Sequence, residues 1–289
     1  MGLITFPSVS NSIYLRNAST ATQEYMDSVN EAEEQVLEMA WDEAVTYNKS
    51  LEGNPVKDPF LAESGMVMAE NYTQVLNLNG DGIMGYVSMP VIDVKLPIYH
   101  GTADDVLRKG IGHLEGSSLP VGGTGSHCVL TGHTGEVHAK LFTDLSKVKK
   151  GDIFFLYTLD QPLAYEVDQI ITVDPDDVTE LRRSIKGDYC TLVTCTPYGV
   201  NTHRLFVRGV RVEYSTEVYE RVISQGATAN SSWFYDWNTW IGIIIGAVVA
   251  LVIALILVLG RKKTAKNAIV RRGGQRRIWD ELLDDAGGG

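Results

Sequence analysis

The chain has 289 residues and a formal net charge of −11, with 25 Lys and Arg against 36 Asp and Glu. Its hydrophobic fraction of 44% is that of a globular protein and argues against disorder. Residues 1–239 carry 17 basic and 32 acidic side chains, a net charge of −15, which argues against nucleic acid as a partner.

The first predicted element is a long amphipathic helix from Thr20 to Leu51. Apolar residues recur along it at helical spacing, and Thr20 with Gln23 fits a capping box at its start. Residues 8–20 are polar and are predicted to be extended or irregular. The residues ahead of them are too few to form the apolar core of a secretion signal, so we expect the natural chain to begin upstream of Met1.

The middle of the chain consists of short apolar runs separated by Gly and Pro turns. This pattern is typical of strands in a closed or nearly closed β-barrel, and we expect about eight of them. The segment Asn77–Gly82 imitates the start of a calcium loop but lacks the bidentate Glu at its twelfth position, so it is predicted to be a turn. The histidines show no metal-ligand spacing, and we expect neither a metal nor a cofactor.

A cysteine, an arginine and a histidine are predicted to lie at the ends of barrel strands. The apolar run from Tyr189 to Thr194 is typical of a buried strand, and Cys195 ends it before a Pro/Gly loop. Arg204 opens the returning strand nine residues later and can face Cys195 across the loop. His133 ends an earlier apolar strand. A nucleophilic thiolate needs such a base and cation nearby, so this combination favours a reactive cysteine over a buried core thiol.

The Thr-Leu-Val-Thr-Cys run that ends at Cys195, the arginine at 204 and the Thr-Gly-His run that ends at His133 together resemble the sortase family of cysteine transpeptidases. The resemblance implies that Cys195 attacks the Thr–Gly carbonyl of an LPxTG-like sorting signal and forms a thioacyl intermediate. His133 would transfer protons, Arg204 would hold the substrate carbonyl and stabilise the oxyanion, and Thr194 is a weaker candidate for an oxyanion contact.

A second motif resembles the pilin-polymerising, or class C, sortases. Asp58, Pro59 and Phe60 match their lid, in which Asp-Pro-Trp or Asp-Pro-Phe plugs the active site. Asp58 would then lie near Arg204, and the Phe60 ring would cover the cysteine. The implied partners are pilin subunits that carry sorting signals and acceptor lysines. The alternatives are hydrolysis by a cysteine protease, anchoring of surface proteins to the cell wall, and an inactive surface-binding barrel.

The other two cysteines, Cys128 and Cys190, each lie five residues before a predicted catalytic residue. In sortase-like barrels the two strands are parallel neighbours, so equal offsets place these cysteines opposite each other and facing the barrel interior. The distance between neighbouring strands suits a disulfide, and an exported domain permits one. The alternative is a pair of apolar thiols in van der Waals contact.

The C-terminal part of the chain is predicted to contain a transmembrane helix at Trp240–Gly260. Its 21 apolar residues match the roughly 30 Å hydrocarbon core of a bilayer. Aromatic residues precede it and eight Lys and Arg follow it, which puts the tail in the cytoplasm and the catalytic domain outside the cell. The expected order is an N-terminal helix and lid (1–65), the catalytic barrel (66–214), a linker (215–239), the transmembrane helix (240–260) and a basic tail (261–289).

Overall fold

The structure is a computed structural model that describes residues 2–51, 71–136, 139–182, 186–230 and 244–257. The chain divides into two units, Met1–Asn230 and Ser231–Gly289. The predicted lid lies outside the described residues, as do residues 240–243 and 258–260 of the predicted transmembrane segment. Residues 244–257 form a helix in the second unit. Within the ranges given above, no helix combines the length and the apolar character needed to cross a membrane.

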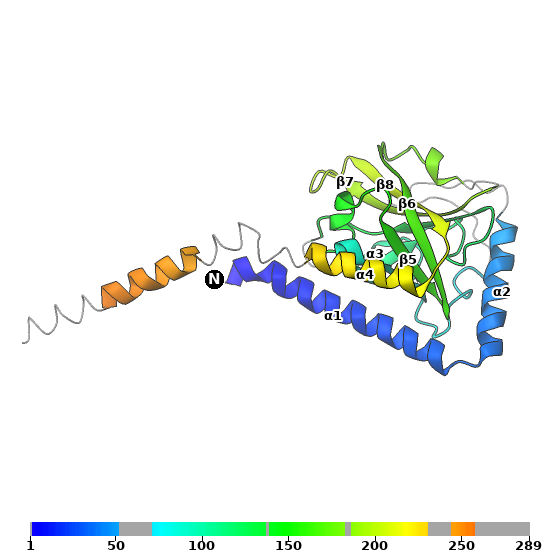
Figure 1. Cartoon of the computed structure of the whole chain (residues 1–289), viewed down its shortest axis with the longest axis horizontal. Coiled ribbons are helices and arrows are strands. Elements are labelled where there is room, and N and C mark those ends of the chain that lie inside the picture. The colour runs from blue at the N-terminus through cyan, green and yellow to red at the C-terminus, as the bar shows by residue number, and fades with distance from the viewer. Residues whose placement is uncertain (1, 52–70, 137–138, 183–185, 231–243, 258–289) are drawn as a thin grey trace, which may run out of the picture. The chain divides into compact units, whose positions relative to one another are not determined.

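Eight strands form a closed barrel in the order β1-β2-β3-β4-β7-β8-β6-β5 (Figure 1), which confirms the predicted mainly β fold. Two pairs, β2–β3 and β4–β7, are parallel, and the others are antiparallel. The strands are β1 Ile83–Met89, β2 Val94–His100, β3 Ile111–His113, β4 Ser126–Thr131, β5 Ile153–Thr158, β6 Gln161–Val173, β7 Asp188–Thr196 and β8 His203–Val212.

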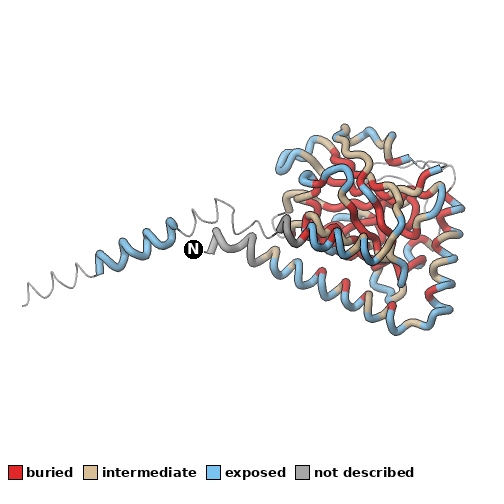
Figure 2. Tube along the Cα trace, in the orientation of Figure 1, coloured by how far each residue is buried: buried red, intermediate tan, exposed pale blue. Residues whose placement is uncertain are grey.

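Helices surround the barrel. The α-helices are α1 Gly2–Glu31, α2 Glu34–Ser50, α3 Asp104–Leu107 and α4 Thr216–Asn230, and the short 3-10 helices are η1 Pro90–Ile92, η2 Thr143–Lys147 and η3 Thr179–Leu181. Figure 1 shows α1 running along one side of the barrel and α2 running along another side, at a sharp angle to α1. Figure 2 shows that buried residues concentrate in the barrel strands, whereas α1, α2 and α4 are largely exposed.

The prediction of one helix from Thr20, preceded by irregular chain, is wrong. Residues 8–20 belong to α1, so Thr20 lies in the middle of the helix rather than at its start. The Thr20 hydroxyl donates to the carbonyl of Arg16 at 3.0 Å. Thr22 and Ser28 make the same bond to the carbonyl four residues earlier, at 2.8 and 2.9 Å. These hydroxyls bond carbonyls of the helix itself and do not cap an alternative turn, so the Ser/Thr-rich stretch is compatible with a helix.

The predicted helix is also divided in two, since Glu33 takes an extended conformation between α1 and α2. Each half is attached to the barrel separately. The Tyr25 hydroxyl of α1 donates to the Met84 carbonyl at 3.3 Å and accepts from the Leu159 amide at 2.7 Å. On α2, the Asn48 side chain bonds both backbone groups of Leu119. The chain therefore bends where two docking sites on the barrel require different helix directions.

The residues that imitate a calcium loop form a turn, as predicted. The side-chain oxygen of Asn77 accepts from the amide of Gly82 at 2.9 Å, and that of Asp81 accepts from the amide of Ile83 at 2.9 Å. Both oxygens stabilise the backbone that leads into β1.

Candidate active site

Cys195 and Arg204 are direct cross-strand partners. The antiparallel ladder of β7 and β8 pairs Cys195 with Arg204 and then Thr196 with His203, just before the loop that joins the strands. Opposite residues of an antiparallel pair project from the same face of a sheet. Cys195 is partly exposed, whereas Arg204 is only 7% exposed. The thiol and the guanidinium group therefore belong to one side of the barrel wall.

That side is the outer face of the barrel. Side chains alternate along a strand, so Cys195 shares a face with Val193, and Arg204 shares a face with Phe206. Val193 and Phe206 pack in an apolar cluster that is separate from the main barrel core, with Leu114, Val129 and Leu181. The candidate site therefore borders a buried apolar cluster that excludes water.

The loop around residues 197–202 holds the Arg204 end of the site. The amides of Val200 and Asn201 both donate to the Pro197 carbonyl at 3.0 Å. The Arg204 Nη1 atom donates to the carbonyls of Asn201 and His203, at 3.4 Å each. These long hydrogen bonds orient the guanidinium group through the backbone of the loop.

His133 lies on the other side of Cys195. The parallel ladder of β4 and β7 runs from Ser126 opposite Asp188 to Thr131 opposite Val193. The amide of Gly132 then donates to the Val193 carbonyl at 3.1 Å, so the pairing continues past the end of β4. At the same register His133 lies level with Cys195. The three predicted catalytic residues therefore lie at one end of the barrel, with Cys195 on β7, Arg204 on β8 and His133 two residues after the end of β4.

Two backbone ties hold the segment that contains His133. The Thr194 hydroxyl donates to the Gly132 carbonyl at 2.6 Å, and the Phe142 amide donates to the His133 carbonyl at 3.1 Å. Thr194 is 2% exposed and projects from the strand on the side opposite to Cys195. Its hydroxyl is thus engaged in joining β7 to the histidine segment, and the oxyanion contact of Thr194 stays a prediction.

Sequence reasoning missed Tyr198, which lies three residues after Cys195 and is 68% exposed. A Cβ atom added at Gly135 would lie 3.2 Å from the Tyr198 ring, so the ring packs directly against the Gly135 backbone. Gly135 has a φ of 71°, a conformation that glycine adopts without strain. The contact joins the loop after the cysteine to the loop after the histidine. The only sign of this contact in the sequence is an aromatic residue in a Pro/Gly turn.

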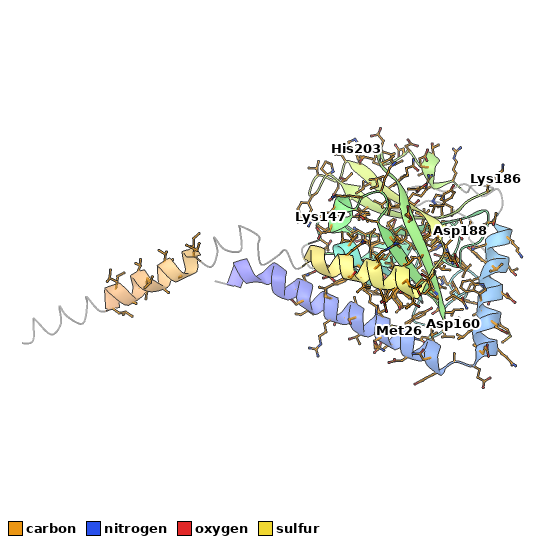
Figure 3. The ribbon with its side chains drawn as sticks, in the orientation of Figure 1. Met26, Lys147, Asp160, Lys186, Asp188 and His203 are labelled. Atoms are coloured by element: carbon orange, nitrogen blue, oxygen red, sulfur yellow. The ribbon has the colours of Figure 1, made fainter. Side chains whose placement is uncertain are left out.

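Two further residues of β7 and β8 have structural roles: His203 beside the site and Asp188 at the far end of β7. The side chain of His203, labelled in Figure 3, pairs through Nε2 with Asp174 at 3.5 Å. Asp188, also labelled there, fixes the start of β7, since its carboxylate accepts from the Gly123 amide at 2.8 Å and the Tyr165 hydroxyl at 2.9 Å. Across the part of the chain that the structure describes, no group of three or more His, Cys, Asp or Glu could hold a metal ion.

Cys128 and Cys190 are direct register partners in the β4–β7 ladder, as their equal offsets predict. They are 2% and 0% exposed and belong to the main barrel core, on the face opposite to Cys195. Both are free thiols in this structure. The register prediction is confirmed, and the disulfide stays a prediction.

Comparison with known proteins agrees with this geometry. Residues 87–212 match the family model of the sortase domain. Among solved structures, sortase C of Streptococcus pneumoniae is 44% identical with a TM-score of 0.64, and the match covers 68% of this chain and 98% of that one. Sortase C-1 of Actinomyces oris is 45% identical with a TM-score of 0.59, covering 62% and 99%.

More distant relatives match a shorter segment. Sortase D of Bacillus subtilis is 31% identical over 131 residues, which is 44% of this chain. The chain covers 63% of the length of that protein and 61% of the length of Sortase A of Bacillus anthracis.

Proposed function

The chain belongs to the sortase family of transpeptidases, and we propose that it polymerises pilins: it cleaves an LPxTG-like sorting signal between Thr and Gly and joins the new carboxyl end to a lysine of another subunit. The observation that carries the proposal is the alignment of His133, Cys195 and Arg204 on three adjacent strand positions. Support for pilins as the substrate comes from relatives such as the pneumococcal sortase C, which has been described for its pilin substrate specificity.

The first half of the reaction uses Cys195 as the nucleophile. Its thiolate attacks the carbonyl carbon of the Thr residue, and the carbonyl oxygen becomes an oxyanion. A guanidinium group carries a permanent positive charge in proteins, so Arg204 serves as a fixed positive charge beside that oxygen rather than as a base. The C–N bond then breaks, His133 protonates the departing Gly amine, and a thioester to Cys195 remains.

The second half reverses these roles. The ε-amine of an acceptor lysine gives a proton to His133 and attacks the thioester carbon. The C–S bond breaks, the thiolate of Cys195 is regenerated, and an isopeptide bond joins the two pilin subunits. The low exposure of Arg204 and the apolar cluster beneath the site strengthen the electrostatic interaction with the oxyanion, because little water surrounds it.

The proposal includes a lid and a membrane anchor, both of which rest on the sequence. Asp58, Pro59 and Phe60 would cover the site, with Asp58 beside Arg204 and the Phe60 ring over Cys195. Residues 240–260 would span the cell membrane, with the catalytic domain outside and the basic tail in the cytoplasm.

The test combines the full chain in detergent with an LPxTG peptide and a lysine-bearing pilin subunit. Cys195→Ala and His133→Ala should each abolish joining while the circular dichroism spectrum remains that of the wild type. The matched control is His203→Ala, beside Arg204, which should retain thioester formation.

The products distinguish the alternative functions. Release of the free acid would indicate a protease, and transfer only to a cell-wall amine would indicate anchoring. If folded wild-type protein forms no thioester at Cys195, the barrel is a binding module and the proposal is wrong.

A further inference from the structure

We propose that Cys128 and Cys190 are joined by a disulfide that forms during folding and fixes β4 to β7, the strands that position His133 and Cys195. The two residues face each other in a ladder whose register is unbroken from Ser126 to Thr131. Neighbouring strands lie about 4.8 Å apart, within the Cα separation of roughly 4.4–6.8 Å that a disulfide tolerates. No change of register is needed to bring the two side chains together.

The surroundings of the pair favour a specific order of reaction. Burial raises the pKa of both thiols, but the Cys128 sulfur contacts the Cys190 thiol and the His113 ring, and these contacts bring the pKa of Cys128 below its ordinary value. The His113 ring is itself held by the Tyr72 hydroxyl at 2.9 Å and the Ser118 carbonyl at 2.9 Å. These contacts require only that β3, β4 and β7 be in place, so Cys128 is the thiol that reacts first as these strands pair.

The oxidant is an external disulfide, either a small molecule or an exported oxidoreductase. The Cys128 thiolate attacks it, forming a mixed disulfide and releasing one thiolate. The Cys190 thiol loses its proton and attacks the Cys128 sulfur, and the second external thiolate leaves. Two electrons and two protons pass from the cysteine pair to the external disulfide, which becomes two thiols.

Burial determines when this reaction takes place. With exposed fractions of 2% and 0%, neither sulfur can meet an external disulfide once the barrel has closed. Oxidation therefore occurs after β4 and β7 pair and before the barrel is complete. The partly exposed Cys195 projects from the opposite face of β7, so the bridge does not involve it.

The decisive variant is Cys195→Ala, in which Cys128 and Cys190 are the only cysteines. The full chain is reduced and denatured, refolded with a mixture of oxidised and reduced glutathione, acid-quenched, denatured again and alkylated. The expected product carries no alkyl group and is lighter than the reduced chain by two hydrogens. Two alkylated cysteines in the refolded protein would overturn the proposal.

Two further measurements make the test independent of refolding and of catalysis. Wild-type chain isolated from the exporting cell under acid quench should carry one alkyl group, at Cys195, and three alkyl groups would refute the bridge. Glutathione disulfide added to folded, reduced protein should oxidise the pair at least tenfold more slowly than during refolding, and an equal rate would refute the order of events. Because these tests count thiols, they stand whether or not the proposed pilin reaction is correct.

Discussion

Replacing Thr194 by Val tests whether the tie between β7 and the histidine segment matters for the reaction. The substitution keeps the β-branched shape that suits a strand and removes only the hydroxyl that donates to the Gly132 carbonyl at 2.6 Å. Thr194 is 2% exposed, so the carbonyl loses a buried partner that water does not replace. Such a loss costs about 1–2 kcal/mol of unfolding free energy.

That cost converts into measurable changes. For a domain of this size the melting temperature falls by roughly 2–4 °C per kcal/mol, so we expect a decrease of about 2–8 °C. The effect on catalysis should be larger, because Gly132 directly precedes His133 and a displacement of about 1 Å costs about a hundredfold in rate. We expect kcat/KM for thioester formation to fall at least tenfold at a temperature where the variant is folded.

Thr191→Val is the matched control. Thr191 lies on the same strand, is 1% exposed, and its hydroxyl makes one bond of 2.7 Å to the His127 ring, away from the catalytic end. Both variants should lose similar stability by thermal unfolding, but only Thr194→Val should lose activity. An equal loss of activity in the two, or full activity in Thr194→Val, would show that the tie has no role in positioning His133.

The remaining predictions concern the lid and the pH dependence of stability. Asp58→Ala and Phe60→Ala should each make a thiol reagent label Cys195 faster, because the plug would be loosened, and labelling at the wild-type rate in both variants would count against it. Burial lowers the pKa of His127 from its ordinary 6.5, and that of His100 in the same direction. The unfolded chain therefore binds more protons than the folded one below pH 6.5, so the free energy of unfolding should decrease as the pH falls through that range. His127→Gln should weaken this dependence in melting curves from pH 7.5 to 5, and unchanged curves would contradict the assignment.

The predictions made from the sequence were most accurate where they relied on a local pattern of residues. The apolar run ending at Cys195, the Pro/Gly loop and the apolar run after Arg204 make one hairpin, and the structure pairs these two residues directly. The equal offsets of Cys128 and Cys190 gave their pairing as well, once the two strands were taken as parallel neighbours. In both cases the period of two along a strand determines which side chains share a face.

Prediction failed where contacts between distant segments decide the structure. The division between α1 and α2 has no Gly or Pro to mark it, and it follows from where Tyr25 and Asn48 bind the barrel. The bond from Thr194 to Gly132 and the packing of Tyr198 on Gly135 each join segments about 60 residues apart. Neither contact produces a periodic pattern in the sequence. Both depend on the conformation of the loops, so neither could be predicted from local pattern.

The closure of the barrel limits how this protein can recognise an extended peptide. Each of the eight described strands has a neighbour on both sides, so no strand presents a fully open edge to which a peptide could add as a further strand. A bound peptide must instead be read by side chains and by the loops at the catalytic end. In the proposed reaction, substrate preference would therefore change through loop residues such as Tyr198, while the strand register that aligns the three predicted catalytic residues stays constant.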